Sequence, residues 1–337
     1  MSSQIIPVFP VVRPLKAHPN PIFPRARLLR LSVTDRCNFR CRYCMPVYGV
    51  PAVSHSDLLS LEELAEMVSW LSCQMPIERV KLTGGEPLVR KGIENLVASL
   101  AAIPNVREVS LTTNGSLLAG NAWSLKASGL SRVSVSLDSL DEARFADLSR
   151  GGKLKHTLDG INAALKAGLT PLKLNTVLQR STWMRDVPQL LDFASENDLE
   201  IRFIELMRTG TEREWAEAEF VSVDEVQRWI SQQSPLARLA TPSGVPAQLS
   251  HVQWNGRHVR VGWIAPRSHP FCGDCERVRL DSRGQLRRCL MDPALLDLAA
   301  LRKVSSLNAR EVVARYMAGK SAPADMDSVL MMSQIGG

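Results

Sequence analysis

The 337-residue chain lacks several features that would place it in other classes of protein. It has no apolar run of the roughly 18 residues that span a bilayer, and its N-terminus lacks the apolar core of a secretory signal. No internal repeat or low-complexity block appears. We therefore expect a soluble, non-secreted, cytoplasmic protein with no membrane partner.

Acidic residues are missing from the first 34 positions. The positive charges there belong to Arg13, Lys16, Arg25, Arg27 and Arg30. They account for most of the formal net charge of +7, so the rest of the chain gives little sign of nucleic-acid binding. Prolines at 7, 10, 14, 19, 21 and 24 exclude a regular helix. We predict a Pro-rich basic arm over residues 1–27 that is extended or disordered.

Cysteine is also scarce, and its placement is uneven. Six of the seven cysteines form two trios, Cys37/Cys41/Cys44 and Cys272/Cys275/Cys289. Thiols three and four residues apart in a non-secreted chain are typical of metal ligands rather than of disulfides. The seventh, Cys73, is expected to pack within a helix.

Six short runs rich in β-branched residues alternate with amphipathic stretches between residues 28 and 207. The predicted strands are residues 28–34, 79–85, 107–114, 132–139, 171–178 and 200–207. The predicted helices include residues 60–70, 92–102, 121–129, 156–168 and 186–197. Alternation at this spacing indicates a parallel sheet with right-handed crossovers.

Five of these strands carry polar side chains at alternate positions, so these side chains share one face of the sheet. They are Arg30, Ser32 and Thr34, then Lys81 and Thr83, then Ser110, Thr112 and Asn114, then Ser134, Ser136 and Asp138, then Lys173 and Asn175. A flat sheet would bury this face, whereas a curved sheet can line a wet interior with it. We therefore predict an α/β fold, a partial (β/α)6 TIM-like barrel over residues 28–207. The alternative is a set of ordinary strands in which the Ser and Thr side chains hydrogen-bond to one another.

The alternation stops after residue 207, and residues 208–337 are predicted to form a C-terminal extension that carries the second trio. Within it we expect a helix in residues 222–233, a hairpin in residues 251–264 turning at Asn255-Gly256, a turn at residues 281–284 and a helix in residues 304–319.

The first trio follows directly on the first strand, at the end where (β/α) barrels place their active sites. Zinc prefers four ligands, and His55 is the nearest further candidate. A 4Fe-4S cluster on three cysteines instead leaves one iron open to a small molecule. "TGGEP" at Thr83 to Pro87 ends the second strand. Its two glycines allow close approach of a ligand, with their amide groups expected to be free to meet it.

The second trio likewise lacks an obvious fourth ligand, with zinc completed by His269 as the alternative. Arg277 and Arg279 lie two residues apart and so on one face of an extended segment. Guanidinium groups bind phosphate in a bidentate manner. The segment is a candidate phosphate clamp beside a metal centre, or else a solvated charged face.

The segments "LRLSVTDRCNFRCRYCMP", "KLTGGEPLVR", "FCGDCERVRLDSRGQLRRCL" and the closing "IGG" resemble the GTP 3′,8-cyclase family, radical S-adenosylmethionine (SAM) enzymes of molybdenum cofactor biosynthesis. The resemblance implies SAM and two 4Fe-4S clusters, one on each cysteine trio, and GTP as substrate. It implies SAM contacts at Tyr43, Gly85, Ser136 and Met207. It implies GTP contacts at Arg30, Lys81, Thr112, Lys173, Arg277 and Arg279, of which Arg277 and Arg279 are also expected to be catalytic.

The family reaction converts GTP to 3′,8-cyclo-7,8-dihydro-GTP through a 5′-deoxyadenosyl radical that removes the ribose 3′ hydrogen. The resemblance also implies a low-potential electron donor and cyclic pyranopterin monophosphate synthase as the next enzyme, and it leaves a homodimer open. It places the terminal Gly336-Gly337 near the active site, although a frayed end fits the sequence equally well. The rivals are a peptide-modifying radical SAM enzyme with an auxiliary cluster and a zinc-stabilised nucleic-acid-binding module.

Overall fold

The computed structural model describes residues 26–51, 54, 57–209, 212–241, 244–303 and 306–320. Residues 1–25 of the Pro-rich arm, His55 and the Gly-Gly tail lie outside these residues.

One sheet organises the described part of the chain. From edge to edge its strands are β12 (Leu296–Asp297), β11 (Gln285–Arg287), β10 (Arg277–Leu280), β1 (Leu28–Ser32), β2 (Arg79–Thr83), β3 (Glu108–Thr113), β4 (Arg132–Ser136), β5 (Lys173–Val177), β6 (Glu200–Ile204), β9 (Arg257–Ile264), β8 (Gln248–Trp254) and β7 (Leu236–Arg238). All neighbouring strands between β10 and β9 in this order are parallel. The pairs outside them, β12 with β11, β11 with β10, β9 with β8 and β8 with β7, are antiparallel. The six expected strands are confirmed, and strands from the C-terminal region extend both edges of their sheet.

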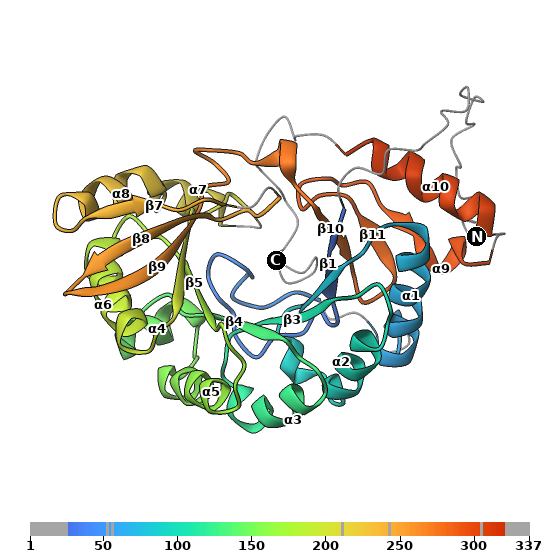
Figure 1. Ribbon diagram of the computed structural model, residues 1–337, viewed down its shortest axis with the longest axis horizontal. Helices are drawn as coiled ribbons and strands as arrows, with labels where there is room; N and C mark the ends of the chain where they lie inside the picture. The colour runs from blue at the N-terminus through green and yellow to red at the C-terminus, as the bar shows by residue number, and fades with distance from the viewer. Residues whose placement is uncertain are drawn as a thin grey trace.

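Helices connect and follow these strands. They are α1 (Leu61–Gln74), α2 (Ile93–Ala101), α3 (Ala122–Ala127), α4 (Glu142–Ser149), α5 (Leu154–Lys166), α6 (Trp183–Glu196), α7 (Arg213–Ala218), α8 (Val223–Ser231), α9 (Leu298–Leu301) and α10 (Ser306–Ala318), with short 3-10 turns η2 (Pro87–Val89), η3 (Leu118–Gly120) and η4 (Cys272–Asp274). Figure 1 shows α1 to α6 outside a strongly curved, open arc of strands. The partial barrel is therefore confirmed. Among the described residues, no helix has both the length and the apolar character needed to cross a bilayer.

Local sequence signals explain where several elements begin and turn. Ser60 and Glu63 form a capping box at the start of α1, each side chain bonding the other residue's backbone amide at 3.1 and 2.7 Å. Asn255 and Gly256 join β8 to β9 with φ angles of 48° and 77°, which the tight hairpin turn requires. The expected hairpin is confirmed.

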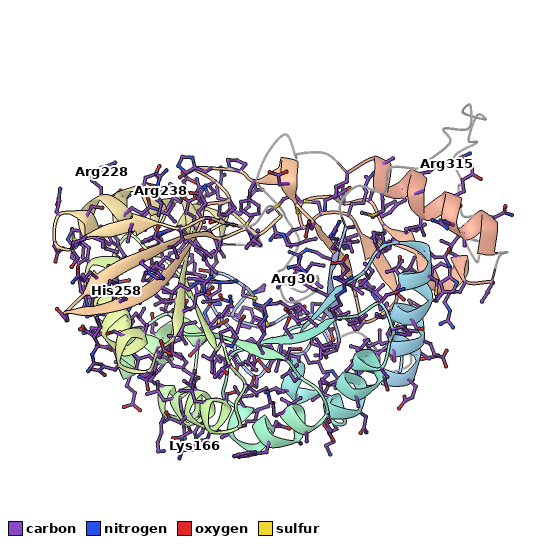
Figure 2. The ribbon with its side chains drawn as sticks, viewed as in Figure 1. Arg30, Lys166, Arg228, Arg238, His258 and Arg315 are labelled. Atoms are coloured by element: carbon purple, nitrogen blue, oxygen red, sulfur yellow. The ribbon has the colours of Figure 1, made fainter. Side chains whose placement is uncertain are left out.

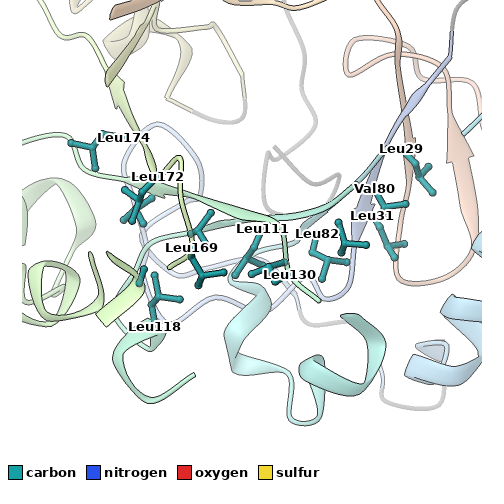
Figure 3. Close-up of a cluster of buried hydrophobic side chains, with 14 of the residues drawn as sticks. Leu29, Leu31, Val80, Leu82, Leu111, Leu118, Leu130, Leu169, Leu172 and Leu174 are labelled. Carbon is teal, nitrogen blue, oxygen red and sulfur yellow. The ribbon is translucent and has the colours of Figure 1, made fainter. Parts of the chain in front are cut away.

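The hydrophobic core lies between the sheet and these helices. Leu29 and Leu31 of β1, Val80 and Leu82 of β2, and Leu111 of β3 are fully buried and point away from the polar face (Figure 3). Burying each such leucine contributes roughly 2 kcal/mol, so the core holds the strands in register while the opposite face stays polar.

The expected packing of Cys73 is wrong. Cys73 lies in α1, but its side chain is exposed. The buried stripe of α1 runs through Leu64, Val68 and Leu71. Cys73 stands two residues beyond this stripe and so turns to the other side of the helix.

Candidate active site

The polar face of the barrel lines a cavity of about 350 Å³ at the C-terminal ends of its strands. This volume falls within the roughly 300–1,000 Å³ of small-molecule sites. The strand register sets Arg30 opposite both Lys81 and Arg279. Figure 2 shows Arg30 on the inner side of the arc, whereas its other labelled basic residues lie at the rim. The expected ligand-sized polar interior is confirmed.

Every predicted site residue except Lys173 lines this cavity. The residues gathered are the thiols Cys37, Cys41, Cys44, Cys272, Cys275 and Cys289, the expected SAM contacts Tyr43, Gly85, Ser136 and Met207, and the expected GTP contacts Arg30, Lys81, Thr112, Arg277 and Arg279. Their individual roles stay predictions.

Lys173 lies on the expected face but one layer deeper. It is the first residue of β5, and its Nζ contacts Glu200 Oε1 and Oε2 at 2.8 and 2.9 Å. Asn175 and Val177, two and four residues nearer the C-terminal end, are the β5 residues that reach the cavity. Two strand residues span about 6.6 Å, so the Lys173 backbone lies about that far along β5 from Asn175.

The loop that carries the first trio is held by backbone bonds to its neighbours. The amides of Arg40 and Arg42 donate to the carbonyls of Ser149 and Leu148 at 3.0 and 3.1 Å, at the end of α4. The amides of Cys44 and Met45 donate to the Cys41 carbonyl at 2.9 and 3.0 Å. The thiols are thus presented by a fixed turn.

The two glycines after β2 are required by the thiol loop itself. A Cβ on Gly84 would lie 2.6 Å from the Thr34 carbonyl oxygen, and one on Gly85 would lie 2.3 Å from that of Arg36. The Gly85 amide donates to the Thr34 carbonyl at 2.8 Å. The expectation that this amide is free for a ligand is therefore wrong, because the neighbouring backbone already uses it.

Glu86 joins the loops after β2 and β3. One carboxylate oxygen accepts from the Leu88 amide at 3.0 Å and from Thr113 Oγ1 at 2.8 Å. The other accepts from the Asn114 amide at 2.7 Å. Burial raises the pKa of Glu86 to about 7 despite these bonds.

Replacing Glu86 by alanine should destabilise the fold by about 3 kcal/mol, since two buried donors and one part-buried donor lose their shared acceptor. Urea unfolding of the protein, followed by circular dichroism, measures this loss. Glu196→Ala, at an exposed position at the end of α6, is the matched control and should change the free energy of unfolding little. Equal stability of Glu86→Ala and the control would show that Glu86 does not hold the two loops.

Asp138 ties the aromatic residue of the thiol loop to the barrel. Tyr43 donates its hydroxyl proton to Asp138 Oδ2 at 2.7 Å, while Asp138 Oδ1 accepts from the Val177 amide at 2.8 Å. Burial raises the pKa of Asp138 to about 6. This contact fixes Tyr43 on the cavity wall between β4 and β5.

The second trio lies beside cations. Burial opposes ionisation of Cys275, but Arg277 and Lys320 outweigh it and lower the pKa of this thiol to about 7. Lys320 Nζ also donates to the Cys275 carbonyl at 2.9 Å. By contrast, burial raises the pKa of Cys37 in the first trio to about 11.

Three arginines crowd one corner of the cavity. Burial and the nearby Arg30 and Arg277 hold the pKa of Arg279 well below its usual range. Burial and Arg277 likewise lower the pKa of Arg30 to about 10. A polyanion placed here would relieve this repulsion, which is what a phosphate clamp requires.

The sulfurs of each trio lie close to one another. The pKa of Cys41 is raised by burial and by the nearby sulfurs of Cys44 and Cys37, so these three sulfurs are neighbours. The same holds for Cys272 with Cys289 and Cys275. Within the described residues, no three potential ligands already converge on the position of a single metal ion.

The zinc alternative at the second trio finds no support in the position of His269. His269 Nε2 lies 2.7 Å from Asp224 Oδ2, and this exposed pair does not contribute to the cavity wall. His269 is thus already paired away from the thiols.

The sequence analysis missed some residues of the cavity wall. Arg202 of β6 contributes to it and contacts Glu200 at 2.8 Å. The period-2 rule that placed the other polar residues would have found Arg202 if applied to the sixth strand. Phe271 and Lys320 also line the cavity, but they depend on contacts within the C-terminal region that have no sequence period.

Known proteins resemble the chain along most of its length. Residues 31–194 match the model of the Radical SAM superfamily, and residues 199–325 match Molybdenum Cofactor Synthesis C. GTP 3′,8-cyclase of Moorella thermoacetica is 42% identical over 318 residues, covering 92% of this chain and 97% of the relative. GTP 3′,8-cyclase 1 of Pseudomonas aeruginosa is 44% identical over 274 residues, covering 81% of this chain and 82% of the relative.

Solved structures share the fold at low identity. Streptococcus suis SuiB bound to precursor peptide SuiA has a TM-score of 0.58 at 13% identity, covering 81% of this chain and 62% of SuiB. Native anSMEcpe with bound AdoMet has a TM-score of 0.57 at 14% identity, covering 87% of this chain and 80% of that protein. At such identities only the fold is shared. The identity to the curated relatives decides the family, and the chain belongs to the GTP 3′,8-cyclase family of radical SAM enzymes.

Proposed function

We propose that this enzyme converts GTP to 3′,8-cyclo-7,8-dihydro-GTP, the first step of molybdenum cofactor biosynthesis. The observation that carries the proposal is a single cavity lined by two thiol trios and by the arginine corner of Arg30, Arg277 and Arg279. Two thiol trios alone fit several radical SAM activities. The three arginines, of which Arg279 is buried, add the chemistry that recognises a triphosphate.

The first trio would hold a 4Fe-4S cluster and the second trio a further one. When bound, the reduced first cluster would supply the electron for reductive cleavage of SAM. Tyr43, Gly85, Ser136 and Met207 line the same cavity as the first trio and would position SAM against its cluster. Since Asp138 holds Tyr43 and the glycine loop packs on the thiol loop, these contacts are fixed before SAM arrives.

GTP would be bound by Arg30, Lys81, Thr112, Arg277 and Arg279. Burial and the nearby Arg202 and Arg30 hold the pKa of Lys81 well below its usual range, and an anionic ligand would restore its charge. Lys173 would contact the phosphates only by leaving Glu200. Arg277 and Arg279 would also orient the purine and ribose for the reaction, since they flank the second trio.

Anaerobic incubation with GTP, SAM and dithionite tests the proposal. We expect 5′-deoxyadenosine to form only when GTP is present, together with the cyclised nucleotide. Cleavage of SAM that ignores GTP would instead favour the peptide-modifying alternative. Iron and sulfide counting should give about eight irons per chain for two clusters, whereas zinc without sulfide would favour the binding module.

The cellular setting follows from the same reaction. We propose a cytoplasmic location, supported by the absence of disulfides among the described cysteines. The product would pass to cyclic pyranopterin monophosphate synthase. A low-potential carrier would reduce the first cluster, and size-exclusion chromatography would decide whether the enzyme is a homodimer.

A further inference from the structure

The loop that carries the first thiol trio exposes an apolar tip. The Gly49 amide donates to the Pro46 carbonyl at 2.9 Å, closing a turn with Val47 and Tyr48 at its apex. Tyr48 is 97% exposed and Val47 is 56% exposed. Neither residue lines the cavity, so the reaction described above does not use them. Large apolar side chains this exposed are a feature of interaction sites when they lie together.

This turn packs directly on the thiol loop. A Cβ on Gly49 would lie 2.9 Å from Arg40 Nε, and Arg40 Nη1 donates to the Cys37 carbonyl at 2.7 Å. Tyr48 lies four positions after Cys44, so their Cα atoms lie within about 14 Å of each other. A protein seated on Tyr48 would approach the first cluster from the solvent side.

The surroundings of the turn are basic. Residues 36–50 contain the three arginines 36, 40 and 42 and no acidic residue. Arg150 donates to the Met45 carbonyl at 3.1 Å and shares the carboxylate of Glu212 with Arg42. The single carboxylate of Glu212 therefore pairs with both Arg42 and Arg150, and it neutralises only part of their positive charge.

We propose that Arg42, Val47, Tyr48 and Arg150, here called the donor surface, dock an acidic one-electron carrier protein. This inference rests on the proposed function, which consumes one electron in each SAM cleavage. The carrier loses one electron and the first cluster gains it, with no bond made or broken. An acidic carrier complements the arginines, and the exposed aromatic supplies the apolar anchor that such interfaces favour.

Two variants test the donor surface, with a reduced flavodoxin and a reduced ferredoxin as probes. Tyr48→Ser should weaken binding of the carrier to the reconstituted enzyme at least about tenfold in anaerobic calorimetry. Arg42→Gln should lower the association rate and flatten its salt dependence. Carrier-supported formation of 5′-deoxyadenosine should fall in both, while dithionite-supported formation and iron content stay unchanged.

Matched controls lie elsewhere on the molecule. Trp123→Ser removes an aromatic side chain that is 64% exposed on α3. Arg315→Gln removes an exposed arginine that pairs with Glu311 on α10 and lies on the outer edge of the molecule in Figure 2. Both should bind the carriers as the unmodified enzyme does.

The outcomes separate this inference from the proposed function. Unchanged carrier binding in Tyr48→Ser and Arg42→Gln, or no association of either carrier with the unmodified enzyme, would overturn the donor surface. A dithionite-supported rate that falls together with the carrier-supported rate would also overturn it, because the residues would then act on the cluster loop. If the unmodified enzyme does not turn over GTP, the proposed function fails, and the binding measurement still decides the surface.

Discussion

Replacing Cys41 by alanine is expected to abolish SAM cleavage. Cys41 supplies one of three neighbouring sulfurs of the first trio, and two sulfurs cannot hold the cluster in the same way. Enzymes commonly exceed the uncatalysed rate by about 10⁶-fold or more, so the residual rate should fall to the assay background. Anaerobic measurement of 5′-deoxyadenosine, with iron counting, checks this result.

The expected loss comes from the sulfur alone. The Cys41 carbonyl accepts the amides of Cys44 and Met45, and alanine keeps both bonds. The variant should therefore unfold at the same urea concentration as the unmodified apoprotein, and its iron should fall from about eight to about four per chain. Cys73→Ala, at an exposed cysteine on α1, is the control and should keep full activity. Normal SAM cleavage by Cys41→Ala would remove the first trio from the chemistry.

The repeating part of the fold could be read from the sequence because its constraints are local. Parallel strands alternate their side chains, so Leu29 and Leu31 had to face the core if Arg30 faced the interior. The same alternation placed Lys81 and Thr112 correctly on the cavity wall. The curvature followed because a flat sheet would have buried that polar row without partners.

Depth and long-range pairing could not be read in this way. The alternation of side chains shows which face of the sheet Lys173 occupies. It does not show how far Lys173 lies from the C-terminal ends of the strands, because that depends on where the loops end. The pairing of Lys173 with Glu200 was therefore not predicted. The attachment of β10 and β9 to opposite edges of the barrel joins residues far apart in sequence. Helix α4 was missed because only Phe145 and Leu148 give it a buried apolar stripe.

Replacing Arg277 by alanine should slow the GTP-dependent step by about 100-fold while both clusters still assemble. A loss of this size is within the range measured when one partner of a buried charge pair is removed. Arg277 lines the cavity, and its guanidinium lies 4.9 Å from the ring centroid of Phe271. The aromatic ring thus holds the guanidinium beside the position proposed for the phosphates. Steady-state measurement of 5′-deoxyadenosine against GTP concentration, with iron counting, checks this result.

The free energy of unfolding of Arg277→Ala shows whether Arg277 binds the phosphates of GTP or instead supports the fold. Without an anion, Arg277 repels Arg30 and Arg279, as their lowered pKa values indicate. Its removal should leave the free energy of unfolding without GTP unchanged or higher, and should abolish the stabilisation that added GTP gives. Arg283→Ala, at a half-exposed arginine beside Asp281 in the turn after β10, is the control and should leave both the free energy of unfolding without GTP and the stabilisation by GTP unchanged. A loss of stability without GTP, or normal turnover of GTP, would show that Arg277 supports the fold rather than the substrate.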